Sequence, residues 1–177
     1  MLFQAYLYLQ QPLPEKLWPS TVNILNKIKT CKDVEGVSDE NMAEIFFGNT
    51  KDANIPCTPA ACLHILEAYN VDLTGKHCVI ANKSRIVGLP LSKLLLHQNA
   101  TVTVCNVHQT DIQEVISTAD IVFAAIGIHD FLKSEWIKDD AIVIDIGMNV
   151  VIHEGNKKLV GDIAFEEVKG DCGSAKG

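Results

Sequence analysis

The sequence predicts an α/β fold: a doubly wound parallel sheet, with part of a second domain before it. Two observations carry this prediction. From about Leu73 onward, short apolar runs alternate with segments of helical periodicity, as in sheets whose strands are joined by helical crossovers. Each run is apolar on both of its faces, as expected for parallel strands covered on both sides. Because such crossovers are right-handed, helices should cover both faces of the sheet.

Four strands and two connecting helices are expected in this part of the chain. The expected strands are residues 77–81 (HCVIA), 100–105 (ATVTVC), 119–127 (ADIVFAAIG) and 141–147 (AIVIDIG). After the first strand, a helix is indicated by apolar residues at helical spacing, namely Val87, Leu91, Leu94 and Leu95. Residues 111–117 can form a short helix after the second strand.

The residues ahead of the sheet divide the chain in two. Thr58 and Pro59 suit the cap and first turn of a helix that should run to Asn70. Residues 1–56 hold one strand, one helix at about residues 20–29 and loops, which is too little for a core of their own. We therefore expect residues 1–56 to be the remnant of another domain and residues 57–177 to form the sheet domain. The remnant should pack on the sheet domain through the helix from Thr58, or on a second copy of the chain, and should expose apolar surface.

Composition narrows the class of protein and its surroundings. The net charge is −7 and no basic run occurs, which argues against a nucleic-acid partner. The first 14 residues read as a strand that starts abruptly, as if sequence upstream were missing, and they are too short to span a membrane. Six cysteines occur without a CxxC pair, so we expect reduced, mostly buried thiols, no metal site and a cytoplasmic location. A mitochondrial location stays open, because the start reads as incomplete.

The turn after the first expected strand is the first candidate site. It reads NKSRIVGLP, residues 82–90. In a parallel α/β sheet, this turn is where backbone N–H groups and a helix N-terminus attract the phosphates of a dinucleotide. Taken alone, a turn of this kind is more often a plain connection than a binding site.

The motifs around this turn resemble the methylenetetrahydrofolate dehydrogenase/cyclohydrolase family. They occur in one order along nearly the whole chain: LQQPLP (9–14), CKDVEGVSDEN (31–41), PCTP (56–59), KSRIVGLP (83–90), NATVTVC (99–105), ADIVFAAIG (119–127), WIKDDAIVIDIGMN (136–149) and LVGDIAFEEV (159–168). The corresponding family patterns include KDVDGxxxxN, PCTPxG, GRSxxVGxP, VIDVGIN and GDVDF.

The resemblance implies a Rossmann-type domain and a two-step activity. Such enzymes oxidise 5,10-methylenetetrahydrofolate to the methenyl compound with NADP, or with NAD in some members, and then hydrolyse it to 10-formyltetrahydrofolate. They bind folate in a cleft between two domains and form homodimers. A folate substrate and a second copy of the chain are therefore the expected partners.

The resemblance also assigns roles to individual residues. Cofactor-binding positions are Asn82, Lys83, Ser84, Val87 and Gly88 in the turn, Ala125 and Gly127 under the cofactor, and Gly147 and Asn149 beside the nicotinamide. Gln10 matches the glutamine that assists a catalytic lysine, and Glu35 stands in place of the aspartate that holds the pterin. Asn82 replaces a glycine of the pattern, which we expect to be tolerated because asparagine adopts left-handed backbone conformations readily.

Two family motifs do not occur in these 177 residues. The YxxxK motif that carries the catalytic lysine is absent, and the chain reaches GDCGSAKG where TPVPGGVGPMT should begin. These departures keep an alternative open, a catalytically inactive remnant that binds a dinucleotide or mediates oligomerisation. A short-chain nicotinamide enzyme with a Tyr/Lys pair finds no support in the sequence.

The choice between NADP and NAD depends on the end of the second strand. NAD-specific sites place an acid there to bind the ribose 2′-hydroxyl group, whereas NADP needs a cation. No acid follows Val104 until Asp111, and Lys83 is the nearest candidate cation. We therefore expect NADP to be preferred.

Overall fold

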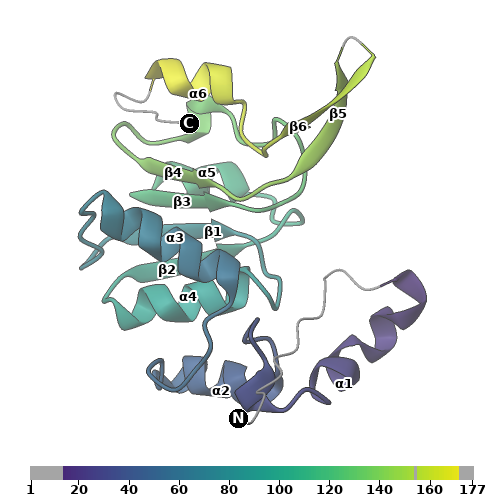
Figure 1. Ribbon diagram of the computed structural model, residues 1–177. Coiled ribbons are helices and arrows are strands. Elements are labelled where there is room, and N and C mark those ends of the chain that lie inside the picture. Colours follow the sequence, from purple (N-terminus) through teal and green to yellow (C-terminus); the bar gives the residue numbers. More distant parts are fainter. Residues whose placement is uncertain (1–13, 154, 172–177) are drawn as a thin grey trace.

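A four-stranded parallel sheet forms the centre of the molecule (Figure 1). The computed structural model describes residues 14–153 and 155–171. The strands are β1 (His77–Ala81), β2 (Thr101–Cys105), β3 (Ile121–Ala124) and β4 (Ile142–Asp145), in the order β2-β1-β3-β4. All three neighbouring pairs are parallel, which confirms the predicted fold class. The central strands are apolar because both of their faces are covered: β3 is buried at every position.

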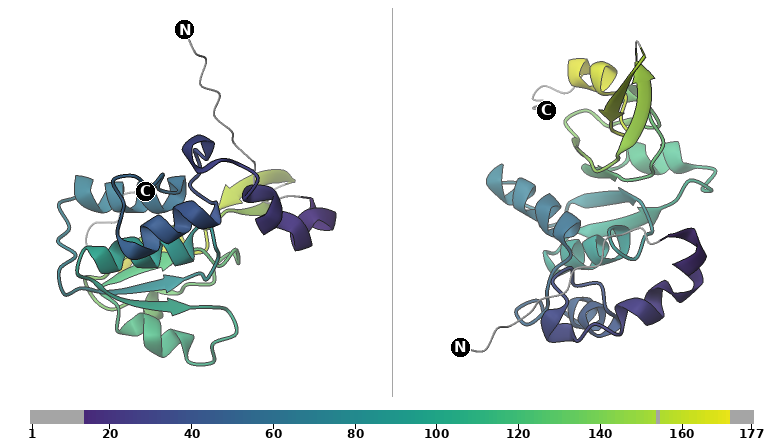
Figure 2. Two further views of the ribbon diagram at one scale, coloured as in Figure 1. Left: turned by 90° about the horizontal axis from the view of Figure 1, so that it is seen from below. Right: turned by 45° about the vertical axis from the view of Figure 1, so that its right-hand side comes forward.

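Helices cover the two faces of the sheet, as predicted (Figure 2). On one face, α3 (Cys57–Ala68) and α4 (Gly88–His97) enclose a core that includes Leu66, Leu91, Leu95, Ile80 and Phe123. On the other face lie α5 (Ile112–Ser117) and α6 (Phe165–Asp171), with Ile116, Val168, Val79 and Val122 in a second core. A 3-10 helix, η3 (Ser134–Trp136), leads into β4. The α3 helix, which was expected to be capped by Thr58, begins at Cys57 with Pro56 at the cap position.

A two-stranded ribbon projects beyond the sheet and was not predicted from the sequence. It consists of β5 (Asn149–His153) and β6 (Asn156–Val160), which pair antiparallel. Gly155, with φ +80°, lies in the connection between them. Three apolar side chains on the ribbon are largely exposed: Val150, Ile152 and Leu159. The register places Leu159 opposite Val150, so these side chains share one face.

Residues 14–56 form short helices beside the sheet domain. They are η1 (Glu15–Ser20), α1 (Thr21–Leu25), η2 (Thr30–Lys32) and α2 (Asp39–Phe47). The helix expected at about residues 20–29 is therefore shorter than predicted, and α2 was not predicted. Ser38 caps α2 by accepting a hydrogen bond from Asn41 N, and Gly48 ends it with φ +88°. The strand expected at the start of the chain falls on residues 1–13, outside the described residues.

The N-terminal segment packs mainly on α4, and it also contacts the first residue of α3 through Glu35 and Cys57. His97 Nε2 lies 3.0 Å from the carbonyl oxygen of Ile45, and Lys93 Nζ lies 3.9 Å from the centroid of the Phe46 ring. These contacts join α2 to α4 (Figure 1). Phe47 is 76% exposed and Phe46 51%, so apolar surface is left open as expected.

The described cysteines are free, as expected from the sequence. Cys62, Cys78 and Cys105 are buried, whereas Cys31 and Cys57 are exposed. Burial raises the pKa of Cys62 and of Cys78 to about 11, which keeps both thiols protonated at neutral pH. Across the described part of the chain, none of the helices combines the length and the apolar character that crossing a bilayer would require.

Candidate dinucleotide-binding site

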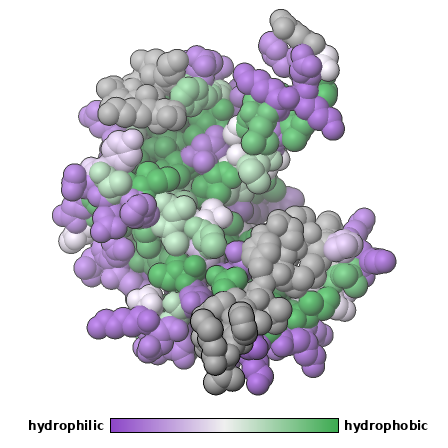
Figure 3. Space-filling view, viewed as in Figure 1, coloured by the Kyte–Doolittle hydropathy of each residue, from purple (hydrophilic) through white to green (hydrophobic). Residues whose placement is uncertain are grey.

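The strand order places a switch point between β1 and β3. From β1 the chain crosses to β2 on one side, and from β2 it returns to β3 on the other. In open α/β sheets, ligands bind outside the carboxyl ends of the strands at such a point. In the space-filling view, the outline of this side of the molecule is hollowed between the β5–β6 ribbon and α1 (Figure 3).

Asn82 organises the turn that follows β1. Its side-chain oxygen accepts hydrogen bonds from Ser84 N (2.7 Å) and Gly88 N (3.1 Å), and its Nδ2 donates to the carbonyl oxygen of Ala125 (2.5 Å). One side chain therefore caps the start of α4 and ties the end of β1 to the end of β3. Asn82 is not among the residues with positive φ, so the conformational reason expected for it is wrong. Its hydrogen bonds supply the reason.

The rest of the turn satisfies several of its own donors. Val87 N donates to Ser84 Oγ (3.2 Å), and Leu89 N to the carbonyl oxygen of Ser84 (3.0 Å). Gly88 is buried, and its N–H group is engaged by Asn82. A phosphate at this turn would therefore rely more on side chains: the Ser84 hydroxyl keeps its own hydrogen for donation, and Lys83 is exposed.

A second group of candidate residues gathers at the ends of β3 and β4. Gly127 is exposed, has φ +79°, and would have nothing within 4 Å of an added Cβ atom, so a ligand can approach its backbone closely. Gly147 N donates to Asp145 Oδ1 (2.9 Å). Asn149 Nδ2 donates to the carbonyl oxygen of Gly161 (2.9 Å) and to Asp162 Oδ1 (2.8 Å), so its amide is bonded within the protein.

Asp162 is the residue of this site that the sequence did not reveal. It is fully buried, and its carboxylate accepts hydrogen bonds from the backbone of Ile126 and Gly127. The segment LVGDIAFEEV served in the sequence only to support the resemblance. The available signal was the acid directly after a glycine in this segment.

The two residues assigned to the folate side lie apart from this edge. Gln10 falls outside the described residues. Glu35 is half-buried in the loop between η2 and α2, where its Oε1 accepts from Cys57 Sγ at 3.4 Å. This contact and burial raise the pKa of the Cys57 thiol, burial being the larger cause.

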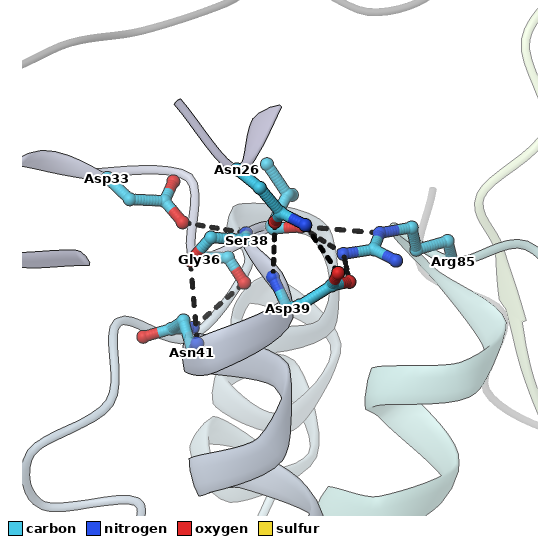
Figure 4. Close-up of polar contacts among 8 residues, drawn as sticks. Asn26, Asp33, Gly36, Ser38, Asp39, Asn41 and Arg85 are labelled. Atoms are coloured by element: carbon cyan, nitrogen blue, oxygen red, sulfur yellow. Dashed lines mark hydrogen bonds and ion pairs between the residues drawn. The ribbon is translucent and has the colours of Figure 1, made fainter. Parts of the chain in front are cut away.

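A hydrogen-bond network joins the Glu35 loop to the dinucleotide turn (Figure 4). The Arg85 guanidinium donates to the carbonyl oxygen of Val37 (2.9 Å) and to Asp39 Oδ1 (2.5 Å). Hydrogen bonds from Asn26 and from Arg85 lower the pKa of Asp39. The fully buried Asn41 closes the loop by donating to the carbonyl oxygen of Gly36 at 2.8 Å. The structure therefore connects the two candidate sites through Arg85.

The end of β2 carries no carboxylate. Cys105 is buried, and Asn106 Oδ1 accepts from His108 N (3.0 Å) in a local turn. Val107 and His108 are exposed, and Asp111 stands at the cap position of α5. The ribose 2′ position of a bound dinucleotide would thus face no acid from β2 itself.

Comparison with known protein families gives one match over most of the sheet domain. Residues 56–175 match the model described as "Tetrahydrofolate dehydrogenase/cyclohydrolase, NAD(P)-binding domain". Among curated relatives, the chain is 41% identical over 160 residues to "Bifunctional protein FolD" of Ehrlichia canis, covering 90% of this chain and 53% of that protein. It is 45% identical over 166 residues to the mitochondrial C-1-tetrahydrofolate synthase of Saccharomyces cerevisiae, covering 92% of this chain and 17% of that protein.

Solved structures agree with the sequence relatives. The Trypanosoma brucei N5,N10-methylenetetrahydrofolate dehydrogenase-cyclohydrolase, complexed with NADP and inhibitor, superposes with a TM-score of 0.84 at 34% identity. The match covers 90% of this chain and 55% of that one. The bifunctional enzyme of Campylobacter jejuni gives a TM-score of 0.79 at 35% identity, covering 94% of this chain and 55% of that one. The chain therefore spans about half the length of the bacterial relatives and solved structures it matches.

Proposed function

The chain belongs to the tetrahydrofolate dehydrogenase/cyclohydrolase family, and from this premise we propose that it binds NADP at the carboxyl edge of its sheet. The proposed reaction is hydride transfer from 5,10-methylenetetrahydrofolate to NADP, followed by hydrolysis of the methenyl product to 10-formyltetrahydrofolate. The relatives and structures compared above are named as enzymes, which favours this function over an inactive remnant.

The observation that carries the proposal is the juxtaposition at the switch point. The turn of residues 82–90 is tied by Asn82 to the end of β3, where Gly127 leaves the backbone uncovered. A dinucleotide laid across this point would meet Ser84 at its bridging phosphates, Lys83 at the ribose 2′ position of its adenosine half, and the ends of β3 and β4 beyond them. Titration calorimetry of the purified chain with NADP and NAD tests the proposal. The absence of heat with either dinucleotide at millimolar concentration would refute it.

Lys83 is expected to set the preference for NADP. Replacing Lys83 by alanine should weaken the binding of NADP about five- to tenfold, the equivalent of about 1–1.4 kcal/mol, and leave the affinity for NAD unchanged. The reason is that only NADP carries the 2′-phosphate that the ammonium group would face. Lys76→Ala is the matched control, because it removes one exposed positive charge just before the amino end of β1. Equal losses for both dinucleotides in the Lys83 variant would exclude this role.

The folate site is proposed for the side of the molecule that carries Glu35. Glu35 would hold the pterin and Gln10 would assist the chemistry, with residues 1–56 serving the folate and residues 57–177 the dinucleotide. Support comes from the Arg85 network, which holds the Glu35 loop against the cofactor turn. Glu35→Gln should then weaken binding of the folate, measured by titration calorimetry, without changing dinucleotide affinity.

A homodimer is proposed from the exposed apolar face of the ribbon. Val150, Ile152 and Leu159 are each more than 60% exposed on one face of β5–β6, which fits a surface that a second copy covers. Sedimentation of the purified chain as a monomer at micromolar concentration would contradict this.

The free cysteines suit a reducing compartment, either the cytoplasm or the mitochondrion, and cell fractionation distinguishes the two.

A further inference from the structure

Asp162 carries a fully buried carboxylate at the edge where the cofactor is proposed to bind. Its side chain has no exposed surface. One oxygen accepts hydrogen bonds from Ile126 N (2.5 Å) and Gly127 N (2.9 Å), and the other from Asn149 Nδ2 (2.8 Å). A buried carboxylate is costly unless hydrogen bonds compensate it. Here three donors from two separate segments converge on one side chain.

A second carboxylate fixes the backbone of Asp162 itself. Asp145 Oδ1 accepts from Asp162 N (3.1 Å), and Oδ2 accepts from Ile163 N (3.1 Å). Each carboxylate lies close to the Cα atom of a glycine, Asp162 to Gly147 and Asp145 to Gly161. A Cβ atom on Gly147 would lie 2.8 Å from Asp162 N and would overlap the Asp162 carboxylate, and one on Gly161 would overlap the Asp145 carboxylate. The glycines are therefore required by the carboxylates, and the ends of β3, β4 and β6 form one bonded unit.

This bonded unit lies where one half of a bound dinucleotide is expected. The adenosine half of a dinucleotide lies toward the strand that follows the first crossover, here β2, and the molecule extends across the switch point. The nicotinamide half would therefore lie over the ends of β3 and β4. Asp162 supports that surface from beneath, since it holds Ile126, Gly127 and Asn149 at once.

We propose that Asp162 is a positioning residue that fixes the surface on which the nicotinamide half of the cofactor rests. The inference rests on the proposed function and extends it to a residue that would not touch the cofactor. Its carboxylate turns the N–H groups of Ile126 and Gly127 inward, so that the bare Cα of Gly127 faces the ligand side. Without Asp162, this turn would have to be ordered whenever the cofactor binds.

The test compares the whole cofactor with its adenosine half. Asp162→Asn keeps the size of the side chain, but places an amide group opposite the Asn149 amide or the two backbone donors. NADP affinity should fall about five- to thirtyfold, the cost of ordering one residue on binding. Affinity for 2′,5′-ADP, which has no nicotinamide, should change less than about twofold. A general loss of structure would weaken both ligands, so the difference between them isolates positioning.

Two further variants keep the test decisive. Asp120→Asn removes a carboxylate at the opposite end of β3, where it accepts from His77 N (2.9 Å) and Lys138 Nζ (2.6 Å), and should leave both affinities unchanged. If Asp162→Asn does not fold, Asn149→Ala replaces it. It removes the amide that donates to Asp162 and to the carbonyl oxygen of Gly161, and it leaves the bonds from Ile126 and Gly127 to Asp162. The same selective loss for NADP is then expected, at a smaller magnitude.

The outcomes separate this inference from the proposed function. A wild-type chain that binds neither NADP nor 2′,5′-ADP defeats the proposed function. A wild-type chain that binds both, with a variant that binds both equally well or loses both equally, overturns the role of Asp162. Selective loss of NADP affinity supports it.

Discussion

Alanine at position 88 is expected to abolish dinucleotide binding and to lower the free energy of unfolding by about 2–3 kcal/mol, the cost of overfilling a packed site. Gly88 starts α4 directly beneath the end of β1. A Cβ atom there would overlap the carbonyl oxygen of Asn82 and lie 2.6 Å from its carbonyl carbon. These are backbone atoms and cannot rotate away, so the turn itself would have to move. Urea unfolding followed by circular dichroism and calorimetry with NADP measure the two effects.

Gly75→Ala provides the matched control for this substitution. Gly75 has φ +72° and would have nothing within 4 Å of an added Cβ atom, so alanine there brings backbone strain without overlap. We expect a loss of about 1 kcal/mol with dinucleotide binding retained. Gly88, in contrast, does not have a positive φ, so the destabilisation by Gly88→Ala would come from steric overlap alone. Unchanged NADP binding in Gly88→Ala would show that this close approach is not needed.

The sheet could be predicted because each of its strands is recognisable in the sequence by itself. β1 and β3 are buried on both faces, which produces continuous apolar runs in the sequence. Their boundaries were less visible: the run 119–127 was expected to be all strand, yet only Ile121–Ala124 pairs. The rest of that run leaves the sheet at Ala125, where the backbone turns to meet Asn82.

The elements that were missed depend on contacts rather than on periodicity. The α2 helix had a cap at Ser38 and a terminator at Gly48, but Ile45 is its only buried apolar residue, and the helix that packs against it, α4, lies far along the chain. The β5–β6 ribbon carries lysines at positions 157 and 158 beside exposed apolar residues, so neither of its faces reads as a core face. Such elements are stabilised by neighbours that local sequence does not show.

For the candidate site, the sequence indicated where residues lie but not what their side chains do. The motif pattern located Asn82 and Asn149, but could not show that both amides bond within the protein. Asp162 was invisible as a site residue because its function depends on reaching Ile126 and Gly127, about 35 positions earlier. Side-chain direction is a tertiary property, and one sequence carries no record of it.

Residues 1–177 alone are expected to show no measurable cyclohydrolase activity and at most trace dehydrogenase activity, because they lack the YxxxK lysine that the proposed reaction uses. The resemblance assigns proton transfer in cyclohydrolysis to a lysine in a YxxxK motif, and no tyrosine of these 177 residues has a lysine four positions later. General acid–base help of this kind contributes about a hundred- to ten-thousandfold in rate. Dehydrogenation needs the folate held over the nicotinamide, and an error of about 1 Å in placement costs on the order of a hundredfold. Glu35 is one methylene longer than the aspartate it replaces and accepts a hydrogen bond from Cys57, so the pterin that it is proposed to hold would be shifted from its position in the family.

An absorbance assay of methenyltetrahydrofolate formation and decay, with purified chain and NADP, measures both steps. Cofactor binding measured on the same sample shows that the protein is folded, so inactivity can be assigned to the chemistry. Turnover within about tenfold of a typical enzyme's roughly 10 s⁻¹ would contradict the prediction.

Such turnover would mean that another lysine acts as the acid–base group. Lys32 is the first to test, because it is half-buried and lies three residues before Glu35. If Lys32→Ala then removed cyclohydrolysis and left NADP affinity intact, the missing role would be assigned to Lys32. If both activities persisted in that variant, the catalytic group would have to come from elsewhere in the chain.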